Sequence, residues 1–462
     1  MTTETSASWR DLMAPGLALR FGLLCLGIWL NAADTLVTVT IMPSVGEDLG
    51  GYQYFGWAVA AYLLGSIIAG AAAGRLSMML GLRQATLVAG AAYVIGCLAS
   101  AVAPDFLTFV LGRLVQGLGA GGIVALCYVA IAVMFPQRLW GKVFGAISAV
   151  WGVATVLGPL VGGVFAELGF WRGAFWMFVV QGAVFVAASV LLMEKGDRVE
   201  RSGGVPVPQL LVLTVAVVMI ASAGIVASPV MGGVLALFGV LVMASLLRVN
   251  AAARTPLLPR SAGDLRRAAG AGYLMIFALE AAAIGLSVYG PAFIQQQHDA
   301  SPLFAGYVVS AIAGGWTVTA LLAAVVPQRM DSVMIRLGAT CVMAGTVWSA
   351  WTLPHRSVAE IFASLLLVGC GFGLTWGPAA KRIISALPGD ETALGSSSIP
   401  TAQMIGGAAG AAGVGAAANA LGFAHGIEPA TATAVGSWLF GALIPLSLIG
   451  WLAGWRLGGM KS

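Results

Sequence analysis

Long apolar runs separated by short polar segments occupy most of the chain of 462 residues. A helix needs about 20 predominantly apolar residues to cross a bilayer, whereas a membrane β-barrel would show alternating segments of about ten. The pattern therefore predicts fourteen spanning helices, at 18–44, 53–77, 84–103, 105–133, 139–166, 172–194, 208–226, 230–248, 269–295, 302–326, 332–352, 357–384, 392–420 and 432–456. The pair within 208–248 is the least distinct.

Positive charges lie almost entirely on one side of this predicted array. All but Arg113, Arg172 and Arg356 of the 23 Lys and Arg residues fall on the side of the N-terminus. Cytoplasmic loops are enriched in Lys and Arg, so both termini are predicted to be cytoplasmic. Removing one span would move later cations to the wrong side, but removing the pair within 208–248 would keep the parity.

Composition supports a membrane protein and excludes two other classes. Only 9% of the residues are charged and 59% are hydrophobic, which excludes a soluble enzyme and a disordered chain. The net charge of +5 follows from the orientation signal, so it does not indicate nucleic acid. The five cysteines stand in apolar runs without Cys-x-x-Cys spacing, so neither disulfides nor a metal site are expected from them.

The polar segments divide the chain into three parts. The two longest, 195–207 and 249–268, bracket the indistinct pair, giving six helices, two helices and six helices. We predict a bundle at 1–194, two linker helices at 195–268 and a second bundle at 269–462. Phe55-Gly56-Trp57 and Phe304-Ala305-Gly306-Tyr307 open corresponding helices of the two bundles, which indicates a distant internal repeat. Secondary transporters commonly place the substrate at such a repeat interface.

Three charges fall deep within predicted spans: Asp34, Arg113 and Glu280. A charge at the bilayer centre costs about 2.5–3.5 kcal/mol even on insertion scales, so it usually faces a cavity and has a function. The alternative is a buried ion pair that only fixes helix packing.

Polar residues accompany two of these charges at helical spacing. Asn31, Thr35 and Thr38 share a helix face with Asp34, and Gln116 shares one with Arg113. We expect the first stripe to line a wet cavity. Burial opposes the charged form of a carboxylate and a nearby Arg favours it. Such a site can bind and release a proton, as a proton-coupled carrier requires.

Small residues recur at helical spacing along the fifth predicted helix, which also contains Pro159. Small residues allow close helix packing in lipid, and proline removes a backbone donor and can bend a helix. Ordinary close packing without a gating role explains the same pattern.

Four motifs together resemble the fourteen-helix drug/proton antiporters of the major facilitator superfamily. They are Ala33-Asp34-Thr35 followed by 42–49, the loop motif with Gly74, Arg75, Gly81 and Arg83, the fourth-helix run 111–120, and the fifth-helix run 152–163. The fifth-helix run, with Gly152, Gly158, Pro159, Gly162 and Gly163, is the most specific, because it is associated with antiporters. The loop motif departs from the family pattern, with Met78 where the family carries an Asp that helps to latch the cytoplasmic side.

The resemblance implies an all-α integral membrane protein with the major-facilitator fold, two six-helix bundles and two extra central helices. It implies proton coupling by Asp34, Arg113 and Glu280, and export of small amphipathic or cationic compounds from a bacterial cytoplasmic membrane by a monomer without a cofactor. The expected cavity residues are Asn31, Thr35, Thr38, Gln116, Trp151, Trp316, Trp376 and Gln403. The fifth-helix motif is expected to take part in gating.

Other functions fit the sequence less well. A lipid or dedicated metabolite exporter would use the same fold, and the sequence does not separate it from a drug exporter. A membrane enzyme would need a cluster of His, Asp or Glu, and the deep acids are two single carboxylates. A channel would usually show rings of charge or carbonyl groups around a pore. Antiport is favoured over uniport and symport only by the fifth-helix motif.

Overall fold

The computed structural model describes residues 9–14, 16–194, 204–226, 228–324, 326–388, 391–423 and 429–460, and these residues form helices and no strand. After the short α1 (Trp9–Leu12), the N-terminal bundle contains α2 (Leu17–Leu49), α3 (Phe55–Leu80), α4 (Leu82–Ala101), α5 (Phe106–Met134), α6 (Trp140–Glu167) and α7 (Arg172–Leu192). The linker helices are α8 (Val207–Ala223) and α9 (Pro229–Ala252). The C-terminal bundle contains α10 (Ala268–His298), α11 (Pro302–Ala324), α12 (Asp331–His355), α13 (Val358–Ser385), α14 (Thr392–Ala420), α15 (Pro429–Gly441) and α16 (Ile444–Gly459).

Helices occupy all fourteen predicted positions, and the all-helical membrane fold is confirmed. Twelve helical stretches of the described chain are long and apolar enough to cross a membrane. The other two positions are α8, which is apolar but has 17 residues, and α14, in which glycines and polar residues such as Gln403 and Asn419 dilute the apolar character. The count of fourteen crossings and the orientation therefore stay predictions.

Proline explains two differences from the predicted boundaries. The first span continues to Leu49 because Pro43 lies inside α2 without ending it. The sequence pattern predicts one continuous helix for the last span. In the structure this span instead breaks between α15 and α16. Pro445 has no backbone N–H to donate to the carbonyl of Gly441, so the helical hydrogen bonds are interrupted at this turn.

Local sequence also fixes where two helices of the N-terminal bundle begin. Gly81 alone separates α3 from α4, with a φ of 82°, which favours glycine. Asp105 is the N-cap of α5, and the backbone N–H of Thr108 donates to its carboxylate at 2.8 Å. This hydrogen bond holds the pKa of Asp105 below its usual value.

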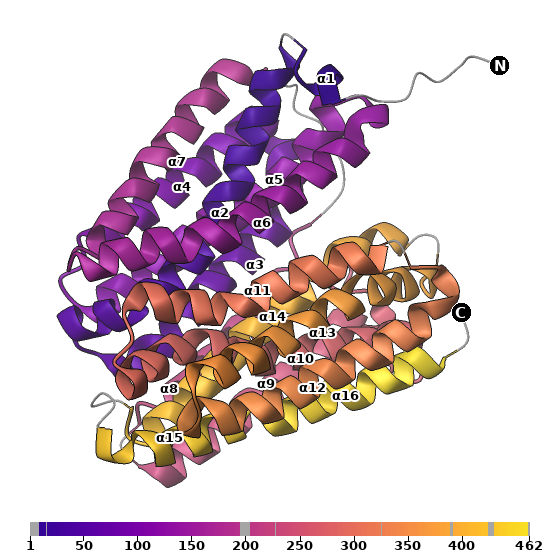
Figure 1. Cartoon of the computed structure of the whole chain (residues 1–462). Helices are drawn as coiled ribbons and strands as arrows, with labels where there is room; N and C mark the ends of the chain where they lie inside the picture. The colour runs from indigo at the N-terminus through magenta and orange to yellow at the C-terminus, as the bar shows by residue number, and fades with distance from the viewer. Residues whose placement is uncertain are drawn as a thin grey trace.

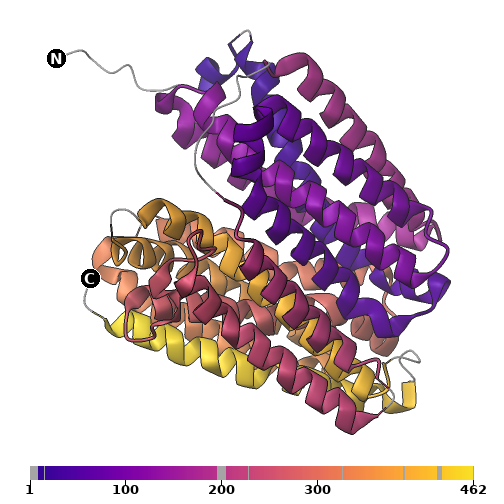
Figure 2. The ribbon, with the colours of Figure 1, turned by 180° about the vertical axis from the view of Figure 1, so that it is seen from behind.

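The two bundles meet at one end and diverge towards the end that carries both chain termini (Figure 1, Figure 2). At the closed end α3 crosses α14, and the Asn419 side chain donates to the Gln53 carbonyl at 2.8 Å. On the other side of the molecule α6 packs on α11, and the Tyr307 hydroxyl donates to the Val156 carbonyl at 3.1 Å. The structure is thus a carrier-like pair of bundles closed at the end opposite the termini.

The linker helices lie on the outside of the C-terminal bundle (Figure 2), where α8 packs on α14. The buried side chain of Asn250 fastens the loop that follows α9. It accepts hydrogen bonds from the backbone N–H groups of Leu257 and Leu258, at 2.7 and 3.0 Å, and donates to the Leu258 carbonyl at 2.8 Å. At the closed end, the indole of Trp57 on α3 donates to the carbonyl of Ala221 on α8 at 3.2 Å.

Candidate functional site

Asp34 and Arg113, which are 79 residues apart, form an ion pair inside the N-terminal bundle. Arg113 Nη1 on α5 lies 2.9 Å from Asp34 Oδ1 on α2, and the side chains are 3% and 0% exposed, respectively. Two of the three deep charges of the sequence therefore neutralise each other in the middle of the bundle. The desolvation cost of each charge makes the loss of either partner strongly unfavourable.

The pair is joined through a single nitrogen, although Arg and a carboxylate commonly form two parallel hydrogen bonds. Arg113 Nη1 donates both to Asp34 Oδ1 and to Gln116 Oε1, the latter at 2.8 Å. The hydroxyl of Thr38 also donates to Asp34 Oδ1, at 3.0 Å. Asp34 Oδ2 and Arg113 Nε are buried without a hydrogen-bond partner in the described part of the chain. Oδ2 is therefore the free acceptor of the site.

Two residues that the sequence analysis does not single out complete the site. The ring of Tyr62, on α3, lies under Arg113, with 4.2 Å from Cζ to the ring centroid, and its hydroxyl donates to Asn31 Oδ1 at 2.9 Å. Cys97, on α4, accepts a hydrogen bond from Gln116 Nε2 at 3.1 Å. Neither residue carries a formal charge, and both stand in ordinary apolar runs. A polar-tipped Tyr in the middle of a span is the signal that could have indicated the first of them.

The polar stripe of α2 packs against neighbouring helices over part of its length. Asp34 and Thr38 are buried, whereas Asn31 and Thr35 are half-buried. The hydroxyl of Thr35 donates to the carbonyl of Asn31 within the helix, at 2.9 Å. Within the stripe, Asp34 thus belongs to the ion pair and Thr38 donates a hydrogen bond to it. Asn31 and Thr35 remain partly exposed.

Glu280, the third deep charge, lies in the C-terminal bundle and has a different environment. Gln403 Nε2, on α14, donates to Glu280 Oε2 at 3.0 Å, and Glu280 on α10 is half-buried. A Cβ on Gly407 would lie 3.8 Å from Glu280 Cγ and 3.0 Å from Leu63 Cδ1 of α3. Glu280 therefore stands close to the seam between the bundles, and its described hydrogen bond goes to Gln403 and not to the Asp34–Arg113 pair.

The three candidate tryptophans lie on helices near the other seam. Trp316 on α11 stacks on Phe372 of α13, with centroids 5.1 Å apart and an interplanar angle of 8°, and it also lies 5.4 Å from Trp376. Trp151 on α6 is 40% exposed, and the Cβ that Gly152 lacks would lie 3.9 Å from Thr317 Cγ2 of α11. Trp316 and Trp376 thus form one aromatic cluster with Phe372, and Trp151 stands apart from it.

The small residues of the fifth-helix motif bring α6 close to two helices. Gly158 and Gly162 face α2: a Cβ on Gly158 would lie 2.5 Å from Leu36 Cβ, and one on Gly162 would lie 2.9 Å from the Val37 carbonyl oxygen. Gly163 faces α11, where its Cβ would lie 2.4 Å from Leu303 Cα. Pro159 Cβ lies 3.2 Å from the Cβ position of Gly306 on α11. The motif therefore joins the helix of Asp34 to the C-terminal bundle.

The loop motif lies at the junction of α3 and α4. Gly74 and Arg75 lie in α3 as it approaches this junction, Arg83 lies in the first turn of α4, and Gly81 makes the turn between the helices. A Cβ on Gly74 would meet no atom within 4 Å. Met78, in place of the family Asp, is half-buried in the last turn of α3.

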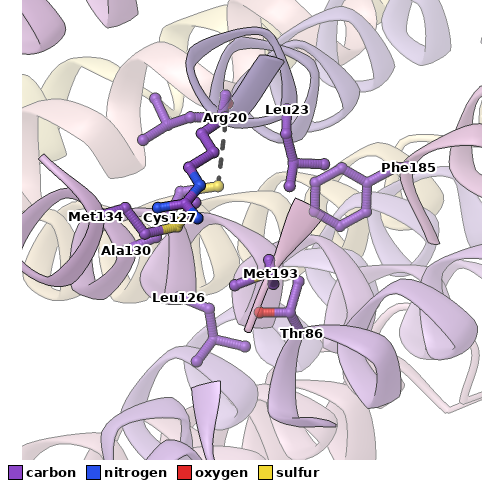
Figure 3. Close-up of a pocket in the computed structure, with 10 residues that line it drawn as sticks. Arg20, Leu23, Thr86, Leu126, Cys127, Ala130, Met134, Phe185 and Met193 are labelled. Carbon is purple, nitrogen blue, oxygen red and sulfur yellow. Dashed lines mark hydrogen bonds between the residues drawn. The ribbon is translucent and has the colours of Figure 1, made fainter. Parts of the chain in front are cut away.

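A small cavity lies between the helices of the N-terminal bundle (Figure 3), lined by residues that include Arg20, Thr86, Cys127 and Phe185. Its volume of about 20 Å³ is enough for about one water molecule. It is therefore too small for an organic substrate. In the described part of the chain, no group of three or more His, Cys, Asp or Glu side chains could hold a metal ion.

A model of the Major Facilitator Superfamily matches residues 24–411. The chain belongs to the major facilitator superfamily. Among curated relatives, a protein of Mycobacterium tuberculosis named "Probable multidrug-efflux transporter" is 28% identical over 435 residues, which cover 90% of this chain and 91% of the relative. A "Probable triacylglyceride transporter" of Mycobacterium leprae is 28% identical over 423 residues, which cover 82% of this chain and 80% of the relative.

Solved structures of the superfamily share the fold at low sequence identity. The nucleoside transporter NupG superposes with a TM-score of 0.66 at 11% identity, covering 94% of this chain and 99% of NupG. The D-xylose-proton symporter superposes with a TM-score of 0.61 at 16% identity, covering 94% of this chain and 97% of the symporter. The family match and the apolar helices together identify this chain as a multi-pass membrane transporter of the major facilitator superfamily.

Proposed function

We propose that this transporter exports small amphipathic or cationic compounds in exchange for protons, by alternating access in a bacterial cytoplasmic membrane. The observation that carries the proposal is the buried Asp34–Arg113 pair, with one carboxylate oxygen saturated and the other free. A structural ion pair is more stable when all its acceptors are satisfied. A carboxylate with a free buried oxygen is suited to accept a proton there.

Protonation of Asp34 changes the charge balance of the N-terminal bundle. The ion pair is neutral as a whole, and the protonated site carries the single charge of Arg113. The membrane potential contributes about 2.3 kcal/mol per charge per 100 mV, so it biases any step that moves this charge across the membrane. With the predicted orientation, the bundles diverge towards the cytoplasm, where the substrate would enter, and protons would load Asp34 from outside after the bundles rock.

The C-terminal bundle provides the features that suit the substrate. Glu280 is a half-buried carboxylate near the bundle seam, which can attract a cation, and Trp316 and Trp376 offer aromatic faces. The name of the relative from Mycobacterium tuberculosis supports a drug-like cargo. Gly158, Gly162 and Gly163 of α6 would transmit movement of α2 to α11, because they pack on both helices.

A lipid is the second candidate cargo, and one specific observation favours it. The relative from Mycobacterium leprae is named a probable triacylglyceride transporter, and its similarity to this chain covers most of its length. In that case the same proton site would drive the movement of an apolar cargo, and Glu280 would have no cationic partner to bind.

Reconstitution in proteoliposomes tests both proposals. With an enclosed pH dye, a panel of lipophilic cations should elicit proton release from vesicles that contain the wild-type protein. The Asp34→Asn variant should lose this response while its chromatographic profile stays that of the folded protein, although its thermal stability falls because Arg113 is left buried without its counter-ion. Proton-coupled transport at the wild-type rate in that variant would exclude the proton site. A response to triacylglyceride and to none of the cations would favour the lipid cargo.

A further inference from the structure

Three described residues of the N-terminal bundle contact Arg113, and one of them is an acid. Nη1 is shared by Asp34 and Gln116, and the guanidinium lies over the ring of Tyr62. When Asp34 is protonated, it no longer neutralises the Arg. The amide oxygen of Gln116 and the face of the Tyr62 ring are then the remaining described partners of a buried positive charge.

We propose that Tyr62 is a positioning residue of the proton site, whose ring holds the Arg113 guanidinium in place while Asp34 is protonated. This inference rests on the proposed proton coupling. Its consequence is that Asp34 can be neutralised without Arg113 leaving the bundle. Tyr62 is suited to this role because its side chain is anchored at the other end, where the hydroxyl donates to Asn31.

The electrostatics of an aromatic ring give the sign of the effect. The negative face of the ring attracts a cation, with a larger energy when both groups are desolvated. Tyr62 is 4% exposed and the side chain of Arg113 is 3% exposed, so the interaction is desolvated. The site is neutral as a whole when Asp34 is ionised and has a charge of one when Asp34 is protonated. The ring therefore favours the protonated site over the ionised one.

Other titratable groups face Asp34 and have to be kept constant in a test. Arg113 comes from α5, Tyr62 from α3, and Tyr93 and Cys97 from α4. Glu280 is carried by α10, which also contacts α2. A substitution at Tyr62 changes one of these groups only, and a comparison of two substitutions there separates the ring from the hydroxyl.

Tyr62→Phe and Tyr62→Leu are the two informative variants. Phe keeps the ring and removes the hydroxyl, whereas Leu removes both. Infrared difference spectra of the purified protein in lipid, recorded against pH, follow the carbonyl band of a protonated carboxylic acid. Loss of the band in Asp34→Asn assigns it to Asp34, and this measurement needs no transport.

We expect Asp34 in the Leu variant to become protonated at a lower pH than in the Phe variant, by about half a pH unit or more. The pH profile of drug-stimulated proton release should shift in the same direction. Equal midpoints, or a higher midpoint in the Leu variant, would overturn the role of Tyr62 and leave proton coupling intact. Absence of any Asp34 titration in the wild type would instead remove the proposed coupling itself. If the Leu variant fails to fold, Tyr62→Met provides the same comparison.

Discussion

The backbones of Gly56 and Gly415 touch where α3 crosses α14: a Cβ on Gly56 would lie 2.9 Å from the Gly415 Cα. The same Cβ would lie 2.4 Å from the carbonyl oxygen of Ala411. Backbone atoms of two packed helices cannot move aside as the tip of a side chain can. The closed end of the molecule therefore depends on the absence of a side chain at Gly56.

Gly56→Ala is expected to part the closed end and to shift the population towards the opposite conformation. Spin labels at Leu168 and Phe304, which are exposed positions near that end, should show a longer distance by pulsed electron paramagnetic resonance. Gly145→Ala is the matched control, because a Cβ there would meet no atom within 4 Å. An unchanged distance distribution in Gly56→Ala would show that another contact closes this end.

Arg113→Gln is expected to lower the free energy of unfolding by about 3 kcal/mol, because it leaves the Asp34 carboxylate buried without its counter-ion. The loss should be larger at high pH and smaller in acid, where a protonated Asp34 needs no counter-ion. Thermal unfolding in detergent across a pH series measures this dependence. The double variant Asp34→Asn/Arg113→Gln should recover part of the stability. A double variant less stable than Arg113→Gln at every pH would argue against an ionised Asp34.

Glu280→Gln is expected to lower the transport rate of cationic substrates and not that of neutral ones. The amide can still accept the hydrogen bond from Gln403, so the local packing is kept. The loss of the negative charge should reduce export of cationic compounds by about tenfold, which corresponds to about 1.4 kcal/mol, and leave neutral amphipathic compounds near the wild-type rate. Transport assays with paired cationic and neutral analogues measure the difference. An equal loss for both analogues would indicate a structural or proton-carrying role for Glu280.

Asn250→Ala is expected to loosen the linker helices. The substitution removes three hydrogen bonds to Leu257 and Leu258, worth about 2 kcal/mol in total after exchange with water. Limited proteolysis should cut the loop after α9 faster than in the wild type, and the melting temperature should fall. Thr214→Ala on α8 is the control, since its hydroxyl bonds only within its own helix at 2.8 Å. Equal cleavage rates in the two variants would show that the hydrogen bonds of Asn250 do not hold the loop after α9.

The positions of the helices could be predicted from the sequence because each span depends on a local excess of apolar residues. The break before α16 could not be predicted, because the apolar run continues through Pro445 and gives no sign that one helical hydrogen bond is lost there. Pro43, by contrast, lies inside α2 without interrupting the helix. Whether a proline interrupts a membrane helix depends on the neighbouring helices that satisfy the freed carbonyl group.

The charged part of the candidate site was visible in the sequence because deep charges in an apolar chain are rare and costly. Asp34 and Arg113 stand out for that reason, and Gln116 stands out because it shares a helix face with Arg113; the structure brings the three together. Tyr62 and Cys97 were not singled out, since an aromatic ring and a thiol cost little in a membrane helix. Their roles depend on how α3 and α4 pack around α5, which is a long-range relationship that spacing within one helix does not reveal.

The contacts described at the closed end are hydrogen bonds to the carbonyl groups of Gln53 and Ala221, together with backbone packing at Gly56. None of these acceptors titrates, so their strength is the same in acidic and in neutral surroundings. These described contacts between the bundles therefore do not respond directly to pH. If the proton gradient sets the direction of transport, protonation of Asp34 inside the N-terminal bundle has to weaken these contacts at a distance, through the movement of helices.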